Sequence, residues 1–187
     1  MLNKADIRRE LRARRAALST DAVWRDDLLV HTLFLSDRVV QRFGAARCVS
    51  GYIGDGEEVD PTPILFAAID RGLTVALPHV TSRDAPMRFL RWEPGDTLVP
   101  GAFGLLQPRS DAEEVSPDLI LTPLVGFDRR LARIGKGAGF YDRAFARLPA
   151  AHRVGLAWSV QEAETVPTDA WDVPLHAVAT ELEWIAT

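Results

Sequence analysis

The sequence predicts an α/β protein in which helices and strands form layers around a sheet that is at least partly parallel. Short apolar runs with the length of strands alternate along the chain with segments whose apolar residues recur at helical spacing. The 187 residues contain no repeat, no low-complexity tract and no linker long enough to separate two domains. We therefore expect one domain spanning 1–187 with a substantial core.

The helices are predicted from apolar spacing and from residues that favour helix starts. In the basic N-terminal segment, about 4–18, Ile7, Leu11 and Leu18 share one stripe of a 3.6-residue period. The polar residues at 19–21 form a break and offer an N-cap for a second helix. The predicted helices are 4–18, 22–42, 62–71 and 140–148.

The strands are predicted from short apolar runs. The predicted strands are 47–53, 73–78, 87–92, 119–127, 153–158 and 177–185. The single cysteine, Cys48, excludes an internal disulfide and is interpreted as a small core residue. Nothing in the spacing of Trp24, Trp92, Trp158 and Trp184 indicates a role other than packing.

Composition excludes several classes of function. The formal net charge is −4, with 47% hydrophobic and 26% charged residues, so nothing in the global charge favours nucleic-acid binding. The N-terminus lacks an apolar segment of signal-peptide type, and no run approaches the ~18 apolar residues of a membrane span. A cytoplasmic protein whose anion sites arise from local charge is expected.

Such a local charge occurs at 133–143, RIGKGAGFYDR, where glycine occupies every second position from 135 to 139. The loop follows an apolar strand and precedes a helix, where backbone N–H groups and the helix dipole favour anions. Glycine admits positive φ and close approach of a ligand to the backbone. The spacing matches neither the Walker A loop nor GxGxxG. A phosphate cradle and a basic surface turn both remain open on this segment alone.

Other charged residues carry weaker signals. Lys4 and Arg8, one helical turn apart, belong either to a solvated basic face or to a phosphate site. Asp142 and Asp172 could hold Mg²⁺, or act respectively as a helix-start acid and a turn residue. Glu58 is either a helix-entry acid or a carboxylate that accepts hydrogen bonds from a heterocycle.

Two further classes of site are disfavoured by spacing. The four histidines are scattered and show no metal-ligand pattern, which argues against a zinc site. No GxSxG element is present, and the single cysteine has no nucleophile context, so nothing supports a catalytic triad.

Taken together, the ordered segments resemble the 5-formyltetrahydrofolate cyclo-ligase family, also called 5,10-methenyltetrahydrofolate synthetases. The family hallmark is P-x-x-x-F-D followed by R-L-G-x-G-x-G-Y-Y-D, and residues 123–143 read PLVGFDRRLARIGKGAGFYDR. The resemblance extends in order through KADIRRELRARRAALS, GEEVDPTPIL, LTVALPHV, FGLLQP and RVGLAWSVQ with VPTDAWDVPL. It therefore covers essentially the whole chain.

The resemblance implies a single-domain layered sandwich with a central, mostly parallel sheet and helices on both faces, similar to the sugar-phosphate isomerase and CoA-transferase-like group. It implies cyclisation of 5-formyltetrahydrofolate to 5,10-methenyltetrahydrofolate, with ATP as co-substrate, Mg²⁺ as cofactor, and ADP and phosphate released. The formyl oxygen would be phosphorylated to an imidate phosphate before N10 displaces phosphate. A cytoplasmic monomer that binds neither nucleic acid nor membrane is expected.

The resemblance also implies roles for individual residues. The implied catalytic residues are Lys136, Arg133 and Tyr141. The implied ATP-binding residues are Lys4, Arg8, Arg133, Ile134, Gly135, Lys136, Gly137, Ala138, Gly139, Phe140 and Tyr141. The implied substrate-binding residues are Glu58, Tyr52, Phe103, Lys136, Gly137, Ala138, Gly139 and Phe140, with core packing the alternative for Tyr52. The implied Mg²⁺ ligands are Asp142 and Asp172.

The chain departs from the family pattern at several positions. Leu131 stands where the family often has Gly, and Ile134, Ala138 and Phe140 replace frequent Leu, Gly (or Lys) and Tyr. His79 and His176 stand where Arg and Asp are common. These departures leave two alternatives open, namely a non-catalytic folate- or nucleotide-binding paralogue and an ATP-dependent kinase or ligase acting on another acceptor.

Overall fold

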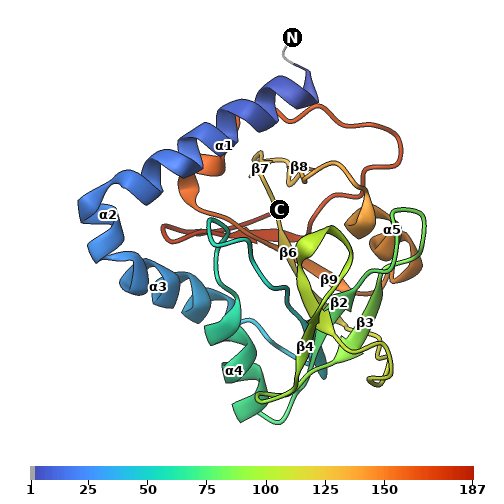
Figure 1. Ribbon diagram of the computed structural model, residues 1–187. Coiled ribbons are helices and arrows are strands. Elements are labelled where there is room, and N and C mark those ends of the chain that lie inside the picture. Colours follow the sequence, from blue (N-terminus) through green and yellow to red (C-terminus); the bar gives the residue numbers. More distant parts are fainter. Residues whose placement is uncertain (1–2) are drawn as a thin grey trace.

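A seven-stranded sheet organises the chain in the computed structural model, which describes residues 3–187 except for the side chain of Phe103 (Figure 1). The strand order is β11-β10-β9-β6-β1-β2-β3. The five strands from β10 to β2 run parallel, and only the edge strands β3 and β11 pair antiparallel. This confirms the mostly parallel sheet. The bounds are β1 Cys48–Ser50, β2 Thr74–His79, β3 Arg88–Arg91, β6 Leu119–Pro123, β9 His152–Leu156, β10 Ala177–Ala179 and β11 Trp184–Ala186.

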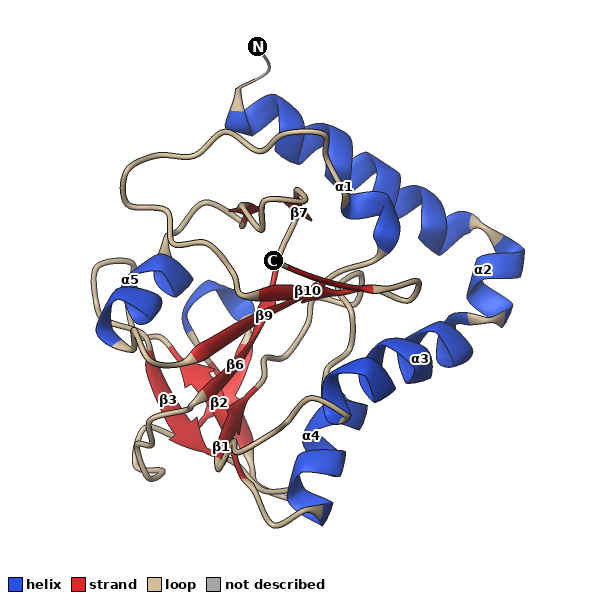
Figure 2. Cartoon of the chain, turned by 180° about the vertical axis from the view of Figure 1, so that it is seen from behind, coloured by secondary structure: helices blue, strands red, loops and turns tan. Residues whose placement is uncertain are grey.

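Helices cover both faces of this sheet, as predicted, because successive strand residues point to opposite faces. Figure 2 shows α3 (Leu28–Val40) and α4 (Thr62–Asp70) on one side and α5 (Phe140–Arg147) on the other. In β6, Leu119 and Leu121 pack in the core with α3 and α4, whereas Ile120 packs with Phe145 of α5. Cys48 is buried on the α5 side, where burial raises the pKa of its thiol to about 11.

The N-terminal helix α1, Lys4–Thr20, lies across a small antiparallel pair formed by β7, Gly126–Phe127, and β8, Arg133–Ile134. Asn3 caps α1 by accepting hydrogen bonds from the N–H groups of Ala5 and Asp6. Ile7 and Leu11 pack against the β7–β8 segment in a third core cluster. The approach is close, since a Cβ on Gly126 would meet the Leu11 side chain at 2.0 Å. The prediction of a basic helix here is confirmed.

The predicted helix 22–42 is wrong in one respect, because the chain forms two helices there. α2, Ala22–Asp26, begins at the N-cap Asp21, which accepts from the N–H of Trp24. Asp27 then leaves helical geometry with φ −96° and ψ 2°, and α3 begins at the next residue. The break allows Trp24 to stack on His31 and to meet Trp158 edge to face.

Two predicted strands are each divided in the structure. The segment 119–127 ends its ladder in the large sheet at Pro123, and β7 pairs with β8 instead. The buried side chain of Gln161 holds this bend, donating hydrogen bonds to the carbonyls of Leu124 and Val125. The segment 177–185 forms β10 and β11 on either side of a turn in which the N–H of Thr180 bonds the Glu183 carbonyl.

Four short elements were not predicted. They are β4 Leu98–Pro100, β5 Leu106–Pro108, the 3₁₀ turn Ala102–Gly104 between them, and the 3₁₀ turn Ser159–Gln161. β8 was also missed, because it lies within the glycine-loop motif. No helix within residues 3–187 is long and apolar enough to cross a membrane.

The order of the strands determines where a ligand can bind. From β1 the chain moves outward to β2 and β3, and it then returns to the other side of β1 as β6. The loops that leave the carboxyl ends of β1 and β6 therefore diverge and open a crevice at that edge. The segments after β1, β2 and β6 all contribute to the cavity described next.

Candidate active site

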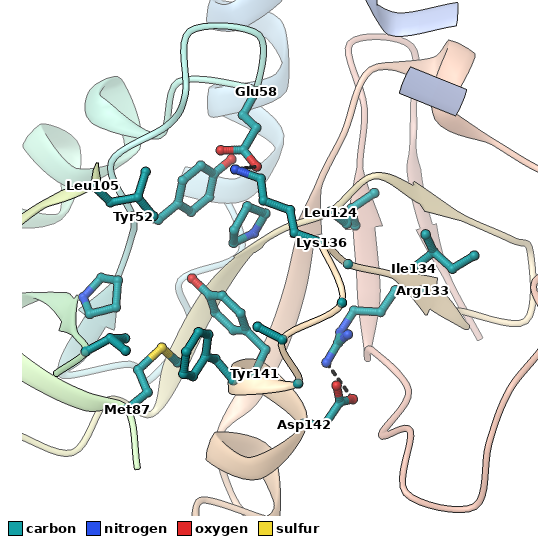
Figure 3. A pocket seen from close by; sticks show the side chains of 18 of the residues that line it. Tyr52, Glu58, Met87, Leu105, Leu124, Arg133, Ile134, Lys136, Tyr141 and Asp142 are labelled. Carbon is teal, nitrogen blue, oxygen red and sulfur yellow. Dashed lines mark hydrogen bonds and ion pairs between the residues drawn. The ribbon is translucent and has the colours of Figure 1, made fainter. Parts of the chain in front are cut away.

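A cavity of about 350 Å³ lies at the carboxyl ends of β1, β2 and β6. Tyr52, Val80 and Leu124 line it just after these strands. The start of α1, the whole glycine loop and the segment 169–172 complete its walls. The structure thus brings together all of the predicted site residues whose side chains it describes. Figure 3 draws part of this lining, including Glu58, Lys136 and Asp142. The side chain of Phe103 lies outside the described part, although its neighbours Ala102 and Leu105 line the cavity.

The cavity has two chemically different ends. The segments of α1 and of 169–172 supply charged groups, and this end is called the phosphate end; its residues are Lys4, Arg8, Asp169 and Asp172. The β2, β3 and β4–β5 regions supply hydrophobic groups, and this end is called the apolar end; its residues are Pro78, Val80, Met87, Ala102, Leu105 and Leu106. The glycine loop runs between the two ends.

The glycine loop requires its glycines for reasons of backbone geometry. Gly137 and Gly139 adopt φ of +101° and +67°, in the left-handed region that disfavours side chains. Gly139 is the N-cap of α5 and has no side-chain cap, so the N–H groups of the first turn of α5 are not capped by a side chain. Arg8 donates from Nε to the carbonyl of Gly135 at 2.8 Å, which attaches the loop to α1.

The base of the loop is organised by Asp128, which the sequence analysis did not assign. Its buried carboxylate accepts hydrogen bonds from the N–H groups of Arg130, Ala132 and Val166, at 2.9, 3.2 and 2.9 Å. This turn holds Leu131 at φ +65°, a conformation that glycine adopts without strain and leucine rarely does. Leu131 is nevertheless buried, so packing opposes the backbone strain.

Lys136 extends from the glycine loop toward the loop after β1, where two carboxylates hold it. Figure 3 shows one of them, Glu58, beside the Lys136 side chain. Its Nζ lies 3.0 Å from Asp55 Oδ2 and 3.0 Å from Glu58 Oε1. Burial alone would lower the pKa of Lys136, but these carboxylates outweigh burial and raise it. The ammonium group is therefore charged, beside a Glu58 side chain that is only 4% exposed.

Arg133 and Asp142 form a largely shielded, partly buried pair on the other side of the loop. Arg133 Nη2 donates to Asp142 Oδ1 at 2.7 Å, and its guanidinium lies over the ring of Phe145, 5.0 Å from the ring centre. The N–H of Val173 also donates to Asp142 Oδ1. The pair thus connects the loop, α5 and the C-terminal segment.

At the phosphate end, Lys4 donates to the carboxylates of Asp169 and Asp172. Asp172 Oδ2 also accepts from the N–H of Asp169 at 2.7 Å. Burial alone would shift the pKa of Lys4 down and that of Asp172 up. The pairing outweighs burial, raising the pKa of Lys4 and lowering that of Asp172. The terminal nitrogens of Arg8 make no hydrogen bond to the described residues.

The donor set suits Mg²⁺ bound together with a polyphosphate rather than a cage made only of protein. No group of three or more His, Cys, Asp or Glu side chains in residues 3–187 is arranged to hold a metal. The hydrogen bonds described above use only Oδ1 of Asp142 and Oδ2 of Asp172. The second oxygen of each carboxylate remains for a cation whose octahedron waters and phosphate oxygens complete.

The aromatic residues of the cavity line it and also hold neighbouring groups in place. Tyr52 is buried in the core, as its alternative interpretation held, and it also lines the cavity while its hydroxyl donates to the Val59 carbonyl at 2.7 Å. Burial and the charge of Glu58 raise the pKa of Tyr141, so its phenol stays protonated. Phe140 carries the Arg143 guanidinium over its ring at 5.1 Å.

Several residues that line the cavity or pair with its cations were missed at the level of sequence. Asp55 and Asp169 pair with the cations at 136 and 4, and Met87 and Trp171 line the apolar and phosphate ends. The position of Asp55 in the turn GDG and of Trp171 beside Asp172 are sequence signals, but neither identifies a partner. Arg15, another basic residue of α1, is buried and pairs with Glu57 in the loop after β1 at 3.1 Å.

The two histidine departures lie outside the cavity lining. His79 is buried and contacts the Pro108 carbonyl through Nδ1 at 3.0 Å. His176 stacks on His152 at 4.7 Å, and its Nδ1 accepts from the N–H of Arg153. Both side chains therefore support strands rather than a ligand.

The sequence is similar to proteins of one family, the 5-formyltetrahydrofolate cyclo-ligases. The model of the 5-formyltetrahydrofolate cyclo-ligase family matches residues 1–181. A 5-formyltetrahydrofolate cyclo-ligase of Escherichia coli (strain K12) is 33% identical over 142 residues, 72% of this chain and 78% of that protein. The Haemophilus influenzae protein of the same name is 40% identical over 100 residues, which span 48% of this chain and 51% of that protein.

The arrangement of the elements is also shared with a solved structure. The 5,10-methenyltetrahydrofolate synthetase of Aquifex aeolicus superposes with a TM-score of 0.75 at 29% identity, covering 99% of this chain and 93% of that one. The similarity thus includes every segment that builds the cavity.

Proposed function

The chain belongs to the 5-formyltetrahydrofolate cyclo-ligase family, and on that premise we propose that it closes 5-formyltetrahydrofolate to 5,10-methenyltetrahydrofolate with ATP and Mg²⁺. The observation that carries the proposal is the position of Lys136. Its ammonium lies beside the buried carboxylate of Glu58, and Lys136 lines the same cavity as the residues of the phosphate end and of the apolar end. A reaction that joins a polyphosphate to a flat, largely apolar substrate needs such a cation where the two meet.

The folate occupies the apolar end in this proposal. Its ring system would lie among side chains such as Met87 and Leu105, which present hydrocarbon to the cavity. Glu58 would accept hydrogen bonds from the amino and N–H groups of the pterin, because a buried carboxylate is a strong acceptor. Tyr52 and Phe103 would form aromatic walls, the former fixed by its hydrogen bond to Val59.

ATP occupies the glycine loop and the phosphate end. The N–H groups of 134–141 and the start of α5 would face the phosphates, with Gly137 and Gly139 leaving room for them. Lys4 and Arg8 would neutralise phosphate charge, Arg8 through terminal nitrogens that its Gly135 hydrogen bond leaves free. Lys4 would leave its aspartates for a phosphate, since polyphosphate carries the higher charge.

The chemistry proceeds in two displacements. The formyl oxygen forms a bond to the γ-phosphorus while the bond from that phosphorus to the bridging oxygen breaks, and ADP departs with the electron pair. N10 then attacks the activated formyl carbon, the carbon–oxygen bond breaks, phosphate departs and N10 loses its proton. The second step is intramolecular, so orientation supplies much of its acceleration.

The protein contributes charge and position rather than a nucleophile. Lys136 would stabilise charge on the phosphoryl group during transfer, and Arg133 would support it from the opposite side of the loop. The protonated Tyr141 would donate a hydrogen bond to an oxygen that gains charge. Asp142 and Asp172 would hold Mg²⁺, which when bound neutralises the charge of the nucleotide phosphates.

A direct assay tests the proposal. Methenyltetrahydrofolate absorbs in the near ultraviolet, so its formation from 5-formyltetrahydrofolate, ATP and Mg²⁺ can be followed continuously. We expect product only when all three are present. Tight folate binding without product would identify a non-catalytic paralogue, and ATP hydrolysis stimulated by another metabolite would identify a different kinase or ligase.

The proposal needs no macromolecular partner. Both substrates are small and water-soluble, and the cavity is formed by one copy of the chain. We propose a monomer acting in the cytoplasm, with neither nucleic acid nor membrane involved.

A further inference from the structure

We propose that Trp171 stacks on the purine base of the nucleotide and so forms a base subsite at the phosphate end of the cavity. The inference deepens the proposed function and rests on it, because it assumes that a nucleoside triphosphate binds there. The starting observation is that Trp171 lines the cavity yet leaves 71% of its surface exposed.

This exposure separates Trp171 from the other four tryptophans. Trp158 is buried, and Trp24, Trp92 and Trp184 are partly buried and pack against the main core. Trp171 has no aromatic or cationic ring contact with the side chains that the structure describes. A large aromatic surface left in water at the mouth of a cavity is a typical anchor for a ligand.

The turn that carries Trp171 is held firmly although the indole is not. The N–H of Asp172 donates to the Asp169 carbonyl at 3.1 Å, and the N–H of Asp169 donates to Asp172 Oδ2 at 2.7 Å. Lys4 crosses from α1 to contact both aspartates. The backbone therefore presents residue 171 at a defined place beside the cations proposed for the phosphates.

The position of Trp171 in the cavity favours contact with the nucleotide base over contact with the pterin. The transferred phosphoryl group has to reach the formyl group near Lys136, whose ammonium touches Glu58. The remaining phosphates then extend toward Lys4 and Arg8, and the nucleoside follows them. Trp171 adjoins Asp172, on the same side as Lys4, whereas the hydrocarbon surface for a pterin lies at the other end.

Stacking recognises the flat face of a ring and does not distinguish the hydrogen-bonding groups at the edge of the base. Base–aromatic stacking tolerates different bases because each has a π-face, and its loss costs roughly tenfold in affinity. We therefore expect GTP to bind within a few-fold of ATP, while a triphosphate without a base loses the contribution of Trp171.

The experiment compares Mg–ATP with inorganic tripolyphosphate, measured by direct binding without turnover. Trp171→Ala is expected to weaken Mg–ATP binding about tenfold and to leave tripolyphosphate binding unchanged. Trp171→Phe should keep most of the ATP affinity, because it retains a ring. Leu105→Ala, which removes exposed hydrocarbon from the apolar end, is the matched control and should leave the ratio of the two affinities unchanged.

A spectroscopic readout follows the same contact. Mg–ATP should change tryptophan emission in the parent protein, and this change should be absent in Trp171→Phe. Equal loss of ATP and tripolyphosphate affinity would mean that Trp171 only supports the Lys4 turn and would overturn the base subsite. Unchanged ATP affinity, a loss confined to 5-formyltetrahydrofolate, or no ATP binding by the parent would overturn it as well.

The experiments distinguish failure of the proposed function from failure of the base subsite. If the parent binds ATP with the expected Trp171 dependence but forms no methenyl product, the base subsite stands and the cyclisation does not. If methenyl product forms and substitution of Trp171 leaves ATP affinity unchanged, the cyclisation stands and only the base subsite is refuted.

Discussion

The two ends of the cavity are prepared for ligands in opposite ways. At the apolar end, Met87 is buried and Leu105 and Leu106 present hydrocarbon before any ligand arrives. At the phosphate end, the Lys4 cation is already paired with Asp169 and Asp172. The first end receives a ligand by displacing water, and the second has to exchange existing ion pairs for new ones.

This difference indicates what each end selects. Hydrocarbon surface favours any flat apolar ligand and discriminates little among them. Paired charges favour a ligand that replaces both partners, and in the proposed function a polyphosphate with Mg²⁺ would do so, with its anion at Lys4 and its cation at Asp172. Lys136, which contacts Asp55 and Glu58, is the residue proposed to act where the two ligands come into contact.

The largest expected effect therefore comes from Lys136. Lys136→Ala should lower kcat by roughly 100- to 1000-fold, because it removes the cation proposed to face the transferred group. The KM for 5-formyltetrahydrofolate should change much less, since the charge matters most during transfer. Steady-state rates from the near-ultraviolet assay measure both. Lys136→Arg, which keeps the charge, is the control, and an unchanged kcat in the alanine variant would exclude the role.

Asp142 tests the proposed Mg²⁺ site. Asp142→Asn should raise the Mg²⁺ concentration needed for half-maximal rate by at least about tenfold, because a neutral amide replaces a charged ligand. It should also lower the free energy of unfolding by on the order of 3 kcal/mol, since Arg133, whose side chain is 7% exposed, loses its counter-charge.

Asp169→Asn is the matched control for the metal titration. Asp169 contacts Lys4 as Asp172 does, but it is not among the proposed Mg²⁺ ligands. Its titration should follow that of the parent. If the Asp142 variant also follows the parent, Asp142 is not a ligand.

The elements of the fold that sequence reasoning predicted are those fixed by local periodicity. The strands at 73–78 and 87–92 and the helices at 62–71 and 140–148 occur within about a residue of their predicted bounds, because apolar spacing determines which face they bury. The divided elements depend on distant contacts. The strand ending at Pro123 bends where Gln161, 36 residues away from Val125, holds the carbonyls, and no local pattern records that hydrogen bond.

The site, like the fold, contains residues that the sequence predicts and contacts that it does not. Site residues within the family motifs were predicted because each motif position carries its own signal, and all the predicted site residues whose side chains are described line the same cavity. Their partners were not identified, because an ion pair such as Lys136 with Asp55 joins loops 81 residues apart and leaves no trace in spacing. Leu131 at φ +65° is a departure whose meaning only the backbone conformation revealed.

Leu105 tests the apolar end with a smaller expected effect. Leu105→Ala should raise the KM for 5-formyltetrahydrofolate by roughly fivefold, because about three methylene-sized groups leave a partly exposed contact. The KM for ATP should stay unchanged if the two ends are energetically separate. Leu182→Ala, an exposed leucine that does not line the cavity, should change neither value. Equal increases in both KM values would contradict the division into two ends.

The smallest effect concerns the stability that the Lys4–Asp172 pair provides without ligand. Asp172→Asn should lower the free energy of unfolding by about 0.5–1 kcal/mol near pH 7, because the pair is only partly buried. The pKa of Asp172 is lowered in the folded state by Lys4, so its contribution is complete above the unfolded value near 3.9 and disappears as pH falls through the folded pKa. The raised pKa of Lys4 places the alkaline limit above about 10.4, its unfolded value.

Urea unfolding of the parent and of Asp172→Asn between pH 2 and pH 8, without nucleotide or Mg²⁺, measures this difference. We expect a constant gap from about pH 5 upward that closes as Asp172 is protonated. A gap that persists at pH 2 would assign the loss to the hydrogen bond from the Asp169 N–H rather than to charge. A small, pH-bounded gap is what the comparison of the two ends requires, because weak ion pairs can be exchanged for a polyphosphate at little cost to folding.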